Sequence, residues 1–163
     1  MDGGLAVAAT VAWVLSVVAG AYLMVSWLAA GGLRGQPTKV TRFPSVVVVG
    51  HPVAALAGLA IWVGFLATAR DAYAWSAFGM LAVVALLGFV LFTRWLVGQG
   101  GRHARGAEQE FPSVAVLVHG VVAVATFILV FLAASRRLWS RRLWSRRYWS
   151  RRLWPRRLWS RRL

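Results

Sequence analysis

The sequence predicts an all-α, polytopic membrane protein: a four-helix transmembrane bundle followed by a basic C-terminal tail rich in arginine and tryptophan. Apolar residues make up 60% of the 163 residues, and the mean hydropathy is +0.65. The apolar residues gather in four long runs, and twelve of the 19 basic residues follow residue 135. Long apolar runs place a chain in the membrane class and not among soluble globular proteins.

The four apolar runs define the expected spans, at residues 4–30, 44–69, 72–97 and 112–134. Each is long enough to cross a hydrocarbon core of about 30 Å at 1.5 Å per residue. A backbone in lipid must satisfy its own hydrogen bonds, and no run shows the alternation typical of a membrane barrel, so we expect helices. The first run has no basic residues ahead of it and exceeds a signal-peptide core, so we expect a retained span.

The four runs form two similar halves. Residues 43–51 read FPSVVVVGH, and residues 111–119, 68 positions later, read FPSVAVLVH. The same ungapped offset aligns Gly20 with Gly88 in the preceding runs. We interpret the pattern as two parallel two-helix repeats, which insert in the same orientation and are related by a pseudo-two-fold axis along the membrane normal.

The repeat gives each half one histidine, His51 and His119, at equivalent places. In a bundle with short connections the second and fourth spans lie diagonally across the core. Each histidine follows the proline that starts its span by seven residues, about 10 Å along a helix. We therefore expect the two at one depth and, if they face inward, facing each other. An ionisable residue inside a membrane is by default a functional-site hypothesis.

Two imidazoles at one depth predict a site for a b-type haem, since haem iron accepts axial histidine. Alanine follows each histidine four residues later, at Ala55 and Ala123, and Gly58 and Thr126 follow one turn further on. Small residues on that face are expected to leave room for a flat macrocycle. The pattern therefore favours an electron carrier that serves a redox partner or membrane complex.

Two arginines complete the expected haem site. Arg34 and Arg102 are equivalent in the repeat and lie on the histidine side of the membrane, where haem propionates need cations. Gly20 and Gly88 are equivalent small positions on the other two spans. The expected cofactor-binding residues are His51, His119, Arg34 and Arg102.

A packing role explains the same residues differently. Membrane helices use small residues to approach closely whether or not anything binds, and histidines can hydrogen-bond across helices. Arg34 and Arg102 also fit the positive-inside bias. This alternative is a non-catalytic membrane subunit or scaffold, and a bare metal ion or a proton relay is a further use of the pair. No CxxCH motif, cysteine or carboxylate within the spans supports a metal site, and His103 is expected to be an ordinary loop residue.

Catalytic residues are not predicted. The sequence shows no nucleophile paired with a base, no phosphate-binding loop and no paired acidic residues, so hydrolase, kinase and transferase functions are set aside. If the protein has a redox role at all, it is expected to be that of an electron carrier. Pro52 follows His51 and predicts a kink. Trp27 and Trp95, at corresponding span ends, are typical interface anchors.

Charge gives opposing signals for orientation. The two loops on the histidine side hold most of the basic residues outside the tail, whereas the opposite turn holds only Arg70. Basic loops stay cytoplasmic, but the tail then carries its arginines on the outer side. Because the loop signal is present in both halves, we expect cytoplasmic loops. The abundance of arginine over lysine, with alanine, glycine and valine, suggests a bacterial inner-membrane protein.

The sequence divides into a transmembrane domain, residues 1–135, and a low-complexity tail, residues 136–163, that repeats RRLWS with a period of five. Five residues turn a helix by about 500°, so no apolar stripe forms. Arginine beside tryptophan suits anionic lipid headgroups. Nucleic acid is disfavoured because the tail is tethered at the bilayer, and expansion of a nucleotide repeat with little function also explains the period.

Overall fold

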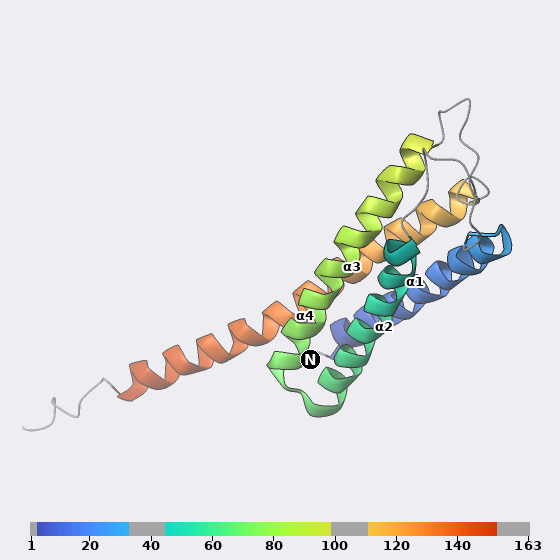
Figure 1. The fold of residues 1–163 in the computed structure, drawn as a ribbon. Coiled ribbons are helices and arrows are strands. Elements are labelled where there is room, and N and C mark those ends of the chain that lie inside the picture. Colours follow the sequence, from blue (N-terminus) through green and yellow to red (C-terminus); the bar gives the residue numbers. More distant parts are fainter. Residues whose placement is uncertain (1–2, 33–44, 99–110, 153–163) are drawn as a thin grey trace, which may run out of the picture.

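The protein folds into four long helices that stand side by side (Figure 1). The computed structural model describes residues 3–32, 45–98 and 111–152, with residues 45, 98 and 137–152 as backbone only. No strand occurs within these ranges, which confirms the predicted all-α class. The helices are α1 (Gly3–Ala29), α2 (Ser45–Thr68), α3 (Asp71–Gly98) and α4 (Ser113–Arg152).

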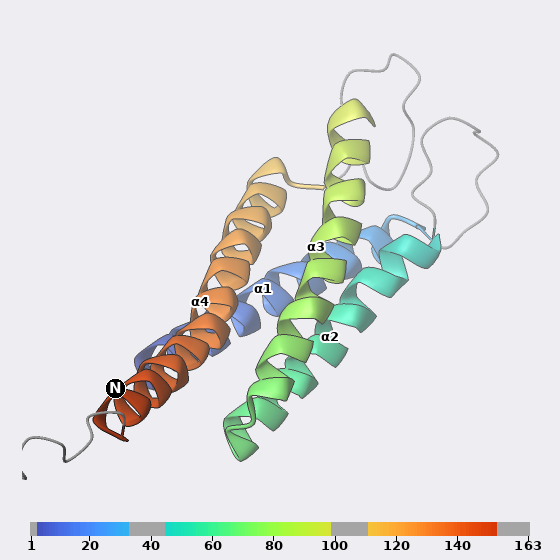
Figure 2. The same ribbon diagram turned by 90° about the vertical axis from the view of Figure 1, so that its left-hand side faces the viewer.

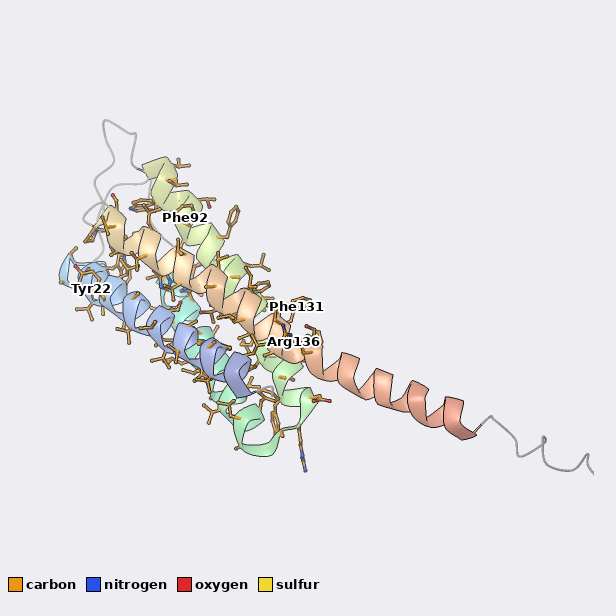
Figure 3. All side chains as sticks on the ribbon, turned by 180° about the vertical axis from the view of Figure 1, so that it is seen from behind. Tyr22, Phe92, Phe131 and Arg136 are labelled. Atoms are coloured by element: carbon orange, nitrogen blue, oxygen red, sulfur yellow. The ribbon has the colours of Figure 1, made fainter. Side chains whose placement is uncertain are left out.

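Every helix contains a stretch that is long and apolar enough to cross a membrane. The stretches agree with the predicted spans to within two residues at each end. Only 11–17% of the most apolar part of each stretch is buried inside the bundle, so large apolar side chains cover the outer surface, among them Leu86, Phe89 and Val121. Tyr22 and Phe131 lie on this surface too (Figure 3). An apolar surface of this size is unfavourable in water and favourable in contact with lipid. The protein is therefore a multi-pass membrane protein.

The turns follow from local backbone chemistry. After α1, Gly31 adopts the left-handed conformation with φ 82°, and the Gly32 N–H donates to the Trp27 carbonyl at 2.9 Å, as in a glycine C-cap. Gly32 lies against the Trp27 ring, where a side chain would clash. Between α2 and α3 the turn is only Ala69 and Arg70, and Ala69 takes the left-handed conformation without being glycine (φ 54°).

The helices pair in a way that places α2 and α4 on a diagonal. Helix α1 packs extensively against α4, and α2 packs against α3 (Figure 2). The contacts between α3 and α4 and between α1 and α2 are smaller, and α2 and α4 have no Cα atoms within 8 Å of each other. The diagonal placement expected from the sequence is therefore found. The start of α1, the α2–α3 turn and the end of α4 share one side of the bundle (Figure 1).

Large side chains fill the half of the bundle next to that side. Trp13 from α1 and Trp62 from α2 are fully buried, with ring centroids 6.3 Å apart. The Trp62 indole N–H donates to the Thr10 hydroxyl at 2.9 Å, and that hydroxyl donates to the Ala6 carbonyl at 2.7 Å. We call this region the tryptophan core; it ties α1 to α2 by a hydrogen bond that lipid cannot replace.

A second, smaller cluster closes the opposite half, beyond the histidines. Its buried members are Trp27, Val48 and Trp95, and we call it the end cluster. The two tryptophans were expected to anchor at the membrane interface, but only 2% of Trp27 and 7% of Trp95 is exposed. Helix geometry explains the difference, because each tryptophan follows a core-facing glycine by seven residues, which returns it to the same helix face.

Helix α4 continues well past the membrane-crossing stretch, which ends at Arg136. At 1.5 Å per residue its 40 residues span about 60 Å, and the last part projects from the bundle (Figures 1 and 3). The predicted boundary between residues 135 and 136 thus falls inside a continuous helix. The division into domain and tail stays a prediction, and residues 153–163 lie outside the described part.

Candidate functional site

The two histidines meet in the middle of the bundle. Each is the seventh residue of its helix, His51 of α2 and His119 of α4, and so lies about 9 Å from the helix start on the side of the two loops. Their ring centroids are 6.2 Å apart and their ring planes make an angle of 82°. Both side chains are half-buried. The structure therefore brings together the pair that the repeat predicted.

A main-chain hydrogen bond holds each ring. His51 Nδ1 lies 3.0 Å from the Val84 carbonyl oxygen on α3, and His119 Nδ1 lies 3.1 Å from the Ser16 carbonyl oxygen on α1. A carbonyl only accepts, so each Nδ1 carries the proton and donates it. In a neutral imidazole the lone pair then resides on Nε2. Both histidines therefore have the tautomer in which the lone pair of Nε2 is available to a hydrogen-bond donor or a metal ion.

Glycine makes both carbonyls accessible. Gly88 follows Val84 by four residues, and Gly20 follows Ser16 by four. A helical side chain leans over the preceding turn, so any larger residue at these two positions would cover the carbonyl. A Cβ atom on Gly88 would lie 3.0 Å from His51 Cε1, and one on Gly20 would lie 3.1 Å from His119 Cε1. The imidazoles occupy the space that the missing side chains leave.

The two halves make the same contact. The histidines, their carbonyl acceptors and the facing glycines are each related by the offset of 68 residues, and the two hydrogen-bond lengths differ by only 0.1 Å. Each histidine reaches a helix of the other half. Sequence reasoning missed the acceptors, because Ser16 and Val84 share no side-chain chemistry and act through their main chain. The aligned glycines were the signal that could have found them.

The surroundings agree with the sequence expectation only partly. Ala55 and Ala123 are half-buried, but the space beside Gly58 is filled, since a Cβ there would lie 3.0 Å from the Trp13 ring and 3.2 Å from Met80. Thr126 is buried and donates to the Val122 carbonyl at 2.8 Å. The level of Gly58 and Thr126 is therefore packed, and the space expected there for a macrocycle is not found.

Three other residues considered for the site lie outside the part of the chain that the structure describes. Arg34, Arg102 and His103 fall outside the described residues, so their roles stay predictions. Helix α2 runs through Pro52. Among the described residues, no three histidine, cysteine, aspartate or glutamate side chains come together as a metal site would require. The histidine pair therefore stands without a third side-chain ligand there.

Fold and site together define a small multi-pass membrane protein with a main-chain-anchored histidine pair between its helices. No protein-family model, curated protein or solved structure matches the chain significantly. The function is therefore argued from the geometry of the pair.

Proposed function

We propose that the protein is a small membrane electron carrier in which His51 and His119 are the axial ligands of one b-type haem. The observation that carries the proposal is the hydrogen bond from each Nδ1 to a main-chain carbonyl. Metal-binding histidines almost always donate their other N–H in this way, which fixes the tautomer and the ring direction.

The spacing of the rings supports a shared metal. An imidazole nitrogen lies about 2.0–2.1 Å from a bound metal ion, so two imidazoles on opposite sides of one metal have ring centroids roughly 6 Å apart. The observed separation is 6.2 Å. A pair of ligands is sufficient for haem, because the porphyrin supplies four nitrogens, whereas a bare zinc site needs three or four protein ligands. The absence of a third ligand among the described residues thus favours haem over a bare ion.

The chain's own residues orient the ligands and limit access to them. The Val84 and Ser16 carbonyls hold the imidazoles, and the Gly88 and Gly20 positions keep the rings at the bundle centre. The end cluster separates the pair from the loop side, and the tryptophan core separates it from the other side. Bound haem supplies one-electron chemistry at its iron. The pair lies in the leaflet next to the two loops, so the redox partner is expected on the loop side. Arg34 and Arg102 are predicted to lie on that side too, as the cations that pair with the haem propionates.

The test is spectroscopic. The protein is purified in detergent and examined for a reducible absorbance of low-spin, bis-histidine haem, before and after addition of haem. We expect this spectrum in the wild type and its loss in His51→Ala and in His119→Ala. His103→Ala, which removes the third histidine of the chain, is the matched control and should keep it. Retention of the spectrum in both site variants would place the pigment elsewhere and refute the proposal.

The alternative function is a non-catalytic membrane subunit or scaffold. The specific observation in its favour is that the rings already meet at an angle of 82° and hydrogen-bond to neighbouring helices, so they tie α2 to α3 and α4 to α1. Such contacts contribute about 0.6 kcal/mol each in a membrane. A colourless protein of normal stability that takes up no added haem would support this alternative.

We also propose that the tail binds anionic lipid headgroups of a bacterial inner membrane. Helix α4 carries the arginine repeat directly out of its span, beginning at Arg136, and a basic residue near an anionic surface contributes about 1 kcal/mol. Full-length protein and a variant ending at Ser135 are placed in liposomes of brominated anionic or brominated zwitterionic lipid. Extra tryptophan quenching of the full-length protein by the anionic lipid, lost at high salt, is expected. Equal quenching of both proteins would refute the proposal.

A further inference from the structure

Trp95 contains a buried hydrogen-bond donor that finds no acceptor among the residues that the structure describes. Its side chain is 7% exposed, and no atom of the described residues accepts a hydrogen bond from its buried Nε1. An unsatisfied buried donor costs free energy, and more so where no water is available. Another buried tryptophan, Trp62, does have an acceptor, because its indole N–H donates to the Thr10 hydroxyl. An acceptor from outside the described residues would therefore remove the free-energy cost of the buried Trp95 N–H.

The position of Trp95 relates this donor to the histidine pair. Trp95 follows Gly88, the residue that faces His51, by seven positions on α3. Seven residues return to nearly the same helix face, about 10.5 Å further along the axis. The indole thus lies two turns from the ligand level, on the loop side, in the end cluster with Val48 of the helix that carries His51.

We infer that the Trp95 indole N–H donates a hydrogen bond to a propionate carboxylate of the haem, an inference that rests on the proposed function. A b-type haem carries two ionised carboxylates on one edge, and a carboxylate in a medium of low dielectric constant requires donors. The orphan donor lies on the ligand-facing side of α3 and toward the nearer membrane surface. It therefore orients the carboxylate edge toward the loops, and Trp95 is a positioning residue for the cofactor.

The experiment separates a hydrogen bond from packing by changing the ligand as well as the protein. Apoprotein in detergent is titrated with haem b and with haem b dimethyl ester, in which both carboxylates are esterified. We expect the wild type to prefer the free acid, and Trp95→Phe to reduce that preference by about ten- to a hundred-fold, the range for a hydrogen bond to a charged group. The low-spin, bis-histidine spectrum should be kept.

Trp62→Phe is the matched control, because it also removes a buried indole N–H but in the tryptophan core. It should leave the preference for the free acid unchanged. If Trp95→Phe does not fold, Trp95→Tyr, which keeps an aromatic ring but moves the donor, should lower the preference instead.

Two results would overturn the inference. An unchanged preference in the Trp95 variant would mean that the indole does not contact the carboxylate, and an equal loss for acid and ester would mean that it acts by packing alone. A wild type that binds neither ligand refutes the proposed function itself, so the two failures are distinguishable.

Discussion

Replacing Gly88 with alanine tests how closely α3 supports His51. The new Cβ would lie 3.0 Å from His51 Cε1, 3.6 Å from Nδ1 and 3.8 Å from Nε2. Carbon atoms prefer separations of about 3.5–4.0 Å, so the ring must retreat by about 0.5 Å or more. The Nδ1–carbonyl distance is 3.0 Å and would then exceed the usual range of about 2.7–3.2 Å for N–H···O bonds. The hydrogen bond that fixes the tautomer should be weakened or lost.

The effect on stability is expected to be small, because two contributions oppose each other. Overpacking costs about 1–3 kcal/mol, whereas alanine gains about 1 kcal/mol of helix propensity over glycine. The net loss is about 0–2 kcal/mol. The effect on the cofactor should be larger, since loss of a hydrogen bond to a metal-binding histidine costs about 10- to 100-fold in affinity. Gly20→Ala should act in the same way through His119.

Haem titration of the apoprotein and thermal unfolding in the same detergent measure the two effects. Gly79→Ala is the matched control, because Gly79 lies on the same helix and a Cβ there meets nothing within 4 Å. It should keep haem affinity and gain up to about 1 kcal/mol of stability. Equal haem affinity in Gly88→Ala and Gly79→Ala would refute the argument that the glycine supports the ligand.

Three further predictions concern the fold. Ala69→Gly should raise the free energy of unfolding by about 1 kcal/mol in a thermal melt, because glycine relieves a left-handed conformation (φ 54°); a loss of stability would contradict this. Thr10→Val should lower it by about 1 kcal/mol by removing the acceptor of the Trp62 N–H, and an unchanged melt would show that this bond contributes nothing. The third prediction concerns orientation and uses single cysteine variants, since the chain has no cysteine of its own. An impermeant maleimide should label Ala72→Cys in intact cells and Ser113→Cys only after permeabilisation, because basic loops stay cytoplasmic. The reverse labelling would place the loops outside.

The sequence was sufficient to predict the four-helix architecture, because a long apolar run in a membrane can form only a few kinds of structure. Length and hydropathy located the four membrane-crossing stretches to within two residues at each end, and short connections predicted the diagonal placement of the second and fourth. The repeat also led to the histidine pair, since equivalent residues of two diagonal helices share one depth. These predictions use only length, hydropathy and symmetry, all of which are properties of the sequence itself.

Other features of the site were beyond the sequence because they depend on main-chain atoms or on which helix face is buried. The carbonyls of Val84 and Ser16 carry no side-chain signature. Trp27 and Trp95 were expected to be interface anchors, since a tryptophan at a span end usually is one. The sequence signal for their inward direction is that each follows a core-facing glycine, Gly20 or Gly88, by seven residues. That the Trp95 N–H has no acceptor among the described residues could be found only from the packing around it.

The distribution of identity between the two halves bears on the choice between haem carrier and scaffold. At the offset of 68 residues, identical pairs concentrate on the loop side, in residues 20–28 and 43–57 and their equivalents. In the other half, Trp13 aligns with Leu81 and Trp62 with Val130, although both tryptophans are fully buried. Apart from the identical alanine pairs Ala6/Ala74 and Ala9/Ala77, dense packing there uses different residues in the two halves. If the histidines only packed helices, the same freedom would be expected at their level, and the matched histidines, glycines and carbonyl contacts favour a site that requires both halves alike.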